Sequence, residues 1–143
     1  MAAQGYVVCR LDNRGTNQRG IEFAQSVHRR LSELEVRDQL RAVEWLRRQP
    51  FIDPERIAVH GWSYGGYMTL RLLEEAPAGT FRCGISGAPV TDWAQYETGY
   101  GERYMDTPLE NPTGYRASSA IENAAKSKPP LLLNHGPDDQ TVM

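Results

Sequence analysis

Four short apolar runs along the chain have the length of buried β-strands. They lie at residues 6–11, 56–60, 81–86 and 131–134. Turn-forming residues precede two of them, Asp53-Pro54 before the second run and Pro129-Pro130 before the fourth. The hydrophobic pattern therefore predicts four strands separated by longer segments.

The longer segments have helical character. Residues 21–30 predict a first helix. In the next segment apolar residues recur at spacings of three and four positions, at Val36, Leu40, Val43 and Leu46. This stripe predicts an amphipathic helix that packs on a sheet, and the apolar stretch 67–73 predicts a buried helix. Strands alternating with helices predict an α/β fold with a mostly parallel sheet and helices on both faces.

Composition narrows the class of protein. The 143 residues suit one domain, and 40% hydrophobic and 24% charged residues are typical of a globular chain. A net charge of −2 provides no basic surface for nucleic acid, and no apolar run reaches the roughly 20 residues that span a bilayer. We therefore expect no nucleic-acid partner and no membrane segment in this chain. Cys9 and Cys83 are not spaced like the ligands of a metal site, and we assign them no function.

A candidate nucleophile lies between a predicted strand and a predicted helix. Gly61-Trp62-Ser63-Tyr64-Gly65 fits the pattern G-x-S-x-G, in which the serine occupies a sharp, strained turn that exposes its hydroxyl. The helix that begins at Tyr64 directs backbone N–H groups to the same place, so the Tyr64 amide is a candidate oxyanion donor. The alternative interpretation is a glycine-rich turn without chemistry.

An acidic partner for Ser63 is expected later in the chain. Asp139 follows the last predicted strand and is the candidate, the alternative being a solvated turn with two acids. All histidines of the chain, His28, His60 and His135, precede it. None suits the role of general base, because His28 lies on a charged helix and the others lie at strand ends. We expect the base to lie outside this chain, whose two ends both look cut.

Several segments together resemble the catalytic domain of the prolyl oligopeptidase family, most closely its dipeptidyl peptidase IV branch. They are residues 12–15 (DNRG), 53–57 (DPERI), 60–66 (HGWSYGG), 88–93 (APVTDW), 102–105 (ERYM) and the loop that begins at His135-Gly136. The resemblance covers essentially the whole chain. It implies that residues 1–143 are the central part of one α/β-hydrolase domain, truncated at both ends, in a protein that also has a β-propeller. It places the catalytic histidine downstream and an oxyanion-hole tyrosine upstream.

The resemblance also assigns site residues. It makes Ser63 the nucleophile and Asp139, rather than Asp138, the catalytic aspartate. It implies a pocket for a proline ring, lined by Tyr64, Val90, Trp93, Tyr96, Tyr100 and Val142. Arg103 corresponds to an arginine that organises the region for the substrate's free N-terminus, the alternative being a surface ion pair with Glu97 or Glu102. Thr141 stands where this branch usually has an asparagine.

The spacing of four aromatic residues has two interpretations. Trp93, Tyr96, Tyr100 and Tyr104 could share one face of a helix. Such a face either packs into the core or, as the resemblance implies, forms part of a substrate pocket.

The expected function is that of a serine peptidase whose parent releases dipeptides after proline or alanine. It needs a peptide substrate and no cofactor or metal, and a homodimer of the full-length parent remains open. Without a histidine base, the chain alone should be inactive. The alternatives are an acylaminoacyl peptidase or carboxylesterase on the same fold, and a hydrolase-like binding chain without turnover.

Overall fold

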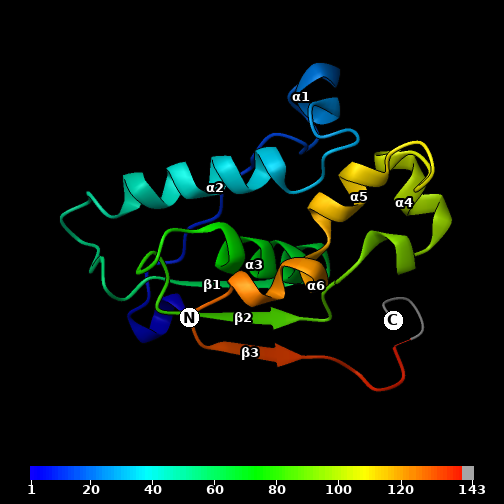
Figure 1. Ribbon diagram of the computed structural model, residues 1–143. Helices are drawn as coiled ribbons and strands as arrows, with labels where there is room; N and C mark the ends of the chain where they lie inside the picture. Colours follow the sequence, from blue (N-terminus) through cyan, green and yellow to red (C-terminus); the bar gives the residue numbers. More distant parts are fainter. Residues whose placement is uncertain (140–143) are drawn as a thin grey trace.

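The computed structural model describes residues 1–139, which form helices around a small sheet (Figure 1). The strands are β1 (Ala58–Trp62), β2 (Cys83–Gly87) and β3 (Leu131–Asn134). The α-helices are α1 (Ile21–Gln25), α2 (Glu33–Leu46), α3 (Tyr64–Glu75), α4 (Thr98–Met105), α5 (Pro112–Ser118) and α6 (Ala120–Asn123). Short 3₁₀ helices are η1 (Ala2–Gln4), η2 (Trp93–Gln95) and η3 (Ala124–Lys126).

The three strands form a parallel sheet in the order β1-β2-β3. In this register Trp62 of β1 pairs with Gly87 of β2, which in turn pairs with Asn134 of β3. The strands therefore end side by side, and in Figure 1 the arrows point to the side where α4 and the C-terminal loop lie. The predicted α/β class with a parallel sheet is confirmed.

Helix α3 packs against β1 and β2 at short range. A Cβ atom on Gly84 would lie 2.6 Å from the Leu73 side chain, so a larger residue there would require the Leu73 side chain to move. Ser86, fully buried, donates a hydrogen bond of 2.9 Å from its hydroxyl to the Gly66 carbonyl. Strand β2 thus presents small side chains to α3. On the opposite face Trp62 and Leu132 are 60% and 61% exposed.

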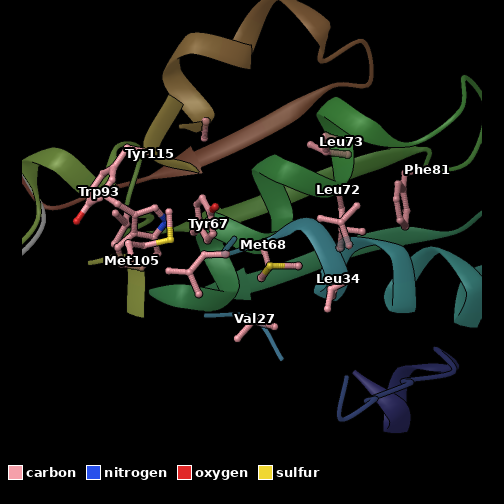
Figure 2. Packing of buried hydrophobic residues seen from close by; sticks show 14 of the residues in the cluster. Val27, Leu34, Tyr67, Met68, Leu72, Leu73, Phe81, Trp93, Met105 and Tyr115 are labelled. Carbon is pink, nitrogen blue, oxygen red and sulfur yellow. The ribbon is translucent and has the colours of Figure 1, made fainter. Parts of the chain in front are cut away.

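The buried core lies around α3 (Figure 2). That helix contributes four buried residues to the core, Tyr67, Met68, Leu72 and Leu73. Helix α2 packs against α3, and its predicted apolar stripe is confirmed, since Val36 and Val43 are buried. Helix α2 therefore packs on α3, which in turn packs on the sheet. Among the described residues no helix is both long and apolar enough to cross a membrane.

The predicted strand at residues 6–11 is wrong. The segment has no regular secondary structure, and its apolar side chains Tyr6, Val7, Val8 and Leu11 are all exposed. An apolar run alone does not make a strand, because a strand needs a neighbour that satisfies its backbone groups. Within residues 1–139 this segment pairs with no strand of the sheet.

The first helix is shorter than predicted, since α1 ends at Gln25. Arg29 has a left-handed backbone with φ 67°, which ends any helix at this point. Its N–H donates a hydrogen bond of 2.7 Å to the Tyr104 carbonyl. The chain therefore leaves the helical path to connect with the end of α4.

A buried arginine links three parts of the fold. Arg71 of α3 is 5% exposed and donates hydrogen bonds to the Ser32 hydroxyl at 3.2 Å and to the Ala117 carbonyl at 3.0 Å. It also pairs with Glu74 and, at 3.1 Å, with Glu75. Burial raises the pKa of Glu74 to about 7, although the charge of Arg71 opposes the shift.

The stability of the protein should therefore depend on the titration of Glu74. The folded state binds its proton more tightly than the unfolded chain does, so this contribution is lost as the pH rises through about 7. We expect the loss to be on the order of 2–3 kcal/mol of unfolding free energy. Urea unfolding at pH 5 and pH 8 should show a smaller pH dependence for Glu74→Gln than for the wild type.

Glu75→Gln is the matched control, because it removes an acid that pairs with the same arginine but is 38% exposed. This variant should keep most of the wild-type pH dependence, because burial and not the charge of Glu75 is the main cause of the raised Glu74 pKa. An unchanged dependence in Glu74→Gln would contradict the assignment.

Candidate active site

Ser63 occupies the turn between β1 and α3. Its backbone has φ 58° and ψ −119°, a strained conformation for a residue with a side chain. Two hydrogen bonds hold it there, from the Ser63 N–H to the Gly87 carbonyl at 2.9 Å and from the Tyr67 N–H to the Ser63 carbonyl at 3.0 Å. The residue is exposed. The predicted sharp, strained turn is confirmed.

Glycines around the turn let backbone segments pass very close to one another. A Cβ atom on Gly61 would overlap the Gly65 carbonyl, and one on Gly66 would overlap the Gly87 carbonyl. A Cβ atom on Gly87 would overlap the Trp62 indole. Gly61, Gly66 and Gly87 are thus required by close approach between β1, β2 and the start of α3.

The start of α3 gives the site its electrostatic character. Tyr64 is the first residue of this helix, so its N–H has no intrahelical acceptor. The positive end of the helix dipole lies at the same place. A negative charge that develops on an oxygen next to Ser63 would be stabilised by both.

The loop after β3 carries the expected acid. Because β2 lies between β1 and β3, the ends of β1 and β3 are separated by roughly 10 Å. A side chain on the loop after β3 can extend across part of this distance. Asp139 is half-buried, and its N–H donates a hydrogen bond of 3.2 Å to the Gly136 carbonyl. Its carboxylate lies 3.9 Å from the His135 ring. Thr141 and Val142, the other expected site residues of this loop, lie outside the described residues.

The positions of His28 and His60 do not suit the role of general base for Ser63. The His28 ring pairs with Asp106 at 3.2 Å and is 46% exposed, which agrees with the predicted surface position. His60 is an exposed residue within β1 rather than in the turn.

The four aromatic residues do not share one helix, so that prediction is wrong. Trp93 belongs to η2, and Tyr96 has an extended backbone that separates it from α4, which carries Tyr100 and Tyr104. Their rings nevertheless meet. Trp93 stacks on Tyr100 with centroids 5.6 Å apart, and Tyr96 contacts both rings edge to face.

This aromatic cluster extends to the residue after Ser63. The Tyr64 ring lies 5.8 Å from Trp93 and 5.5 Å from Tyr67, between centroids. Trp93 is 2% exposed, whereas Tyr96 and Tyr100 are half-buried. The cluster is therefore core at Trp93 and an apolar wall at its outer tyrosines. The interpretation as a core-packing face is confirmed at Trp93, and the substrate pocket stays a prediction.

Val90 and Arg103 are the remaining predicted site residues that the structure describes. Val90 follows β2 and is 4% exposed, so it packs in the hydrophobic core that also includes Trp93. Arg103 of α4 is exposed, and its guanidinium lies 5.7 Å from the centre of the Tyr104 ring.

Sequence reasoning missed one residue of this region. Glu35, in the first turn of α2, is 2% exposed, and its carboxylate accepts a hydrogen bond of 2.7 Å from the Tyr64 hydroxyl. Burial raises the pKa of Glu35, and the Tyr64 hydrogen bond opposes the shift. The only available signal was its place between Leu34 and Val36, which are both buried.

A cavity of about 640 Å³ lies at the opposite edge of the sheet. It is lined by residues that precede β2 and β3, among them Phe81, Arg82 and Pro130. Ligands of open α/β sheets bind outside the carboxyl ends of the strands, which is where Ser63 lies. The cavity is therefore separate from the candidate site.

A parallel α/β sheet with a serine on a strained strand-to-helix turn defines the α/β-hydrolase class. The chain belongs to the prolyl oligopeptidase family, whose model matches residues 1–143.

Individual relatives agree with this assignment. The chain is 43% identical over 139 residues to “Probable dipeptidyl-aminopeptidase B” of Aspergillus oryzae, and 44% identical over 140 residues to the protein of the same name from Ajellomyces capsulatus. Each match covers 96% of this chain and 15% of the relative. The crystal structure of Porphyromonas gingivalis dipeptidyl peptidase 4 matches 92% of this chain and 19% of its own, with a TM-score of 0.89 and 42% identity. The chain thus spans about one-seventh of the curated relatives' length.

Substitution of Gly66 should disrupt the turn. The added methyl group in Gly66→Ala would overlap the Gly87 carbonyl, and neither backbone segment can move without breaking the turn. We expect a loss of about 3 kcal/mol or more in unfolding free energy, measured by urea or thermal unfolding.

Gly65→Ala provides the control, because a Cβ atom there would meet no atom within 4 Å. It should leave stability nearly unchanged. Equal stability of the two variants would show that the close approach at Gly66 does not constrain the fold.

Proposed function

We propose that the chain is the central part of the catalytic domain of a serine peptidase, with Ser63 as its nucleophile. The observation that carries the proposal is the Ser63 turn itself, strained, exposed and placed at the start of α3. Membership of the prolyl oligopeptidase family supports it. Since the chain covers only 15% of its curated relatives, we propose that the domain continues at both ends.

The chemistry follows from these positions. The Ser63 hydroxyl attacks the scissile carbonyl and passes its proton to a histidine that lies outside this chain. The Tyr64 N–H stabilises the oxyanion, and the leaving amine takes the proton as the acyl-enzyme forms. Asp139 orients the histidine, and water then releases the acyl group. Without that histidine, the 143-residue chain alone should hydrolyse nothing measurable.

The proposed substrate is a peptide from which a dipeptide is released after proline or alanine. The names of the relatives, a dipeptidyl-aminopeptidase and a dipeptidyl peptidase, support the release of a dipeptide. The outer tyrosines of the aromatic cluster offer a flat apolar wall beside Tyr64, and a proline ring is compact and apolar. Val90 and Val142 complete this pocket in the proposal, and Arg103 and Thr141 contact the substrate's amino-terminal part.

Labelling with a fluorophosphonate probe tests the nucleophile in the full-length protein. Ser63→Ala should abolish labelling and hydrolysis. Asp139→Asn should lower kcat by about 10⁴-fold, because the histidine is then held in the wrong tautomer. Asp138→Asn is the neighbouring control and should retain activity. Labelling that survives in Ser63→Ala would refute the proposal.

A panel of substrates assayed in the same experiment separates the alternatives on this fold. Gly-Pro anilide should be cleaved, and acetyl-Ala anilide and short acyl esters should not, because only the proposed activity needs a free amino terminus. Preference for acetyl-Ala anilide or for esters would favour the acylaminoacyl peptidase or carboxylesterase instead. A wild-type protein that neither labels nor cleaves any of them would favour a binding chain.

A further inference from the structure

We propose that Glu35 is a positioning residue of the substrate pocket, which acts by holding the Tyr64 side chain at a fixed distance from Ser63. This inference rests on the proposed function, because it concerns the same pocket. It goes beyond that function by assigning a role to a residue of α2, a helix that contributes no other group to the site.

The contact is short and buried. The Tyr64 hydroxyl donates to Oε1 of Glu35 at 2.7 Å, and Glu35 is 2% exposed. The other carboxylate oxygen, Oε2, is buried and has no hydrogen-bond partner within residues 1–139. The Tyr64 phenol is therefore the one side chain that this carboxyl group contacts by a hydrogen bond in the described part of the chain.

Packing alone gives no reason for an acid at this position. Its neighbours Leu34 and Val36 are buried apolar residues, and burying a carboxyl group costs free energy that a leucine would not cost. A hydrogen bond from a phenol to a carboxylate offsets part of that cost and has a direction. Glu35 thus lowers the stability of the fold, and its hydrogen bond orients the Tyr64 side chain.

Tyr64 is the residue whose orientation matters to the site. Its backbone N–H is the proposed oxyanion donor, and its ring contacts Trp93, on which the outer tyrosines of the aromatic cluster pack. Both parts are attached to one Cα atom next to Ser63. A hydrogen bond from α2 to the end of the ring fixes the wall relative to the nucleophile, because the ring can no longer rotate away from the cluster.

The pocket should therefore lose discrimination when the hydrogen bond is lost. Proline fits the wall more closely than alanine, so the ratio of kcat/KM for Gly-Pro anilide to that for Gly-Ala anilide reports the wall's position. This ratio does not depend on the fraction of protein that is folded, since both substrates meet the same active molecules. A merely structural role for Glu35 would leave it unchanged.

Four variants of the full-length protein test the inference. Glu35→Leu removes the acceptor and Tyr64→Phe removes the donor, and each should lower the ratio about tenfold. The double variant should lower it no further than either single change. Glu35→Gln retains an acceptor oxygen and should keep the ratio within about twofold of the wild type. Tyr64→Phe leaves Glu35 in place, so the test remains decisive even if Glu35→Leu folds poorly.

The outcomes separate the two proposals. A ratio that is unchanged in both single variants, in a protein that labels at Ser63 and cleaves Gly-Pro anilide, overturns the role of Glu35 and leaves the proposed function standing. A ratio that falls further in the double variant shows that Glu35 does not act through Tyr64. A wild-type protein that cleaves no Gly-Pro anilide overturns the proposed function, and the role of Glu35 with it.

Discussion

The close approach between the start of α3 and the ends of β1 and β2 is the constraint on which the site depends. The backbone around Gly66 lies against the Gly87 carbonyl, and the same carbonyl accepts the Ser63 N–H. No side chain fits between these segments. The helix and the two strands therefore hold Ser63 in a strained conformation with positive φ that it would not adopt in a free chain.

The surroundings of this turn combine apolar packing with directed polar contacts. The aromatic rings give the region its shape, whereas two buried side chains tie α3 to its neighbours through hydrogen bonds: Glu35 of α2 accepts from Tyr64, and Arg71 of α3 donates to Ser32. Buried polar groups of this kind add little net stability, but they fix the relative positions of the elements that they join. Helix α2 thus contributes to the site without lying beside the nucleophile.

Local features of the sequence predicted the parts of the molecule that local structure determines. The motif from Gly61 to Gly65 joins a strand to a helix as expected, with Ser63 between them, because turn geometry depends on a few consecutive residues. The strand at 6–11 was wrong because a strand depends on a partner elsewhere. The single aromatic helix was wrong because the chain is extended at Tyr96. The burial of Glu35 depends on tertiary packing, which single-residue patterns do not report.

The most direct test of the central claim is a crystal structure of the full-length protein after reaction with an organophosphonate. The reagent should be bonded to the Ser63 Oγ atom, with its phosphoryl oxygen about 3 Å from the Tyr64 backbone nitrogen. Bonding at another residue, or a phosphoryl oxygen that points away from the start of α3, would contradict the account.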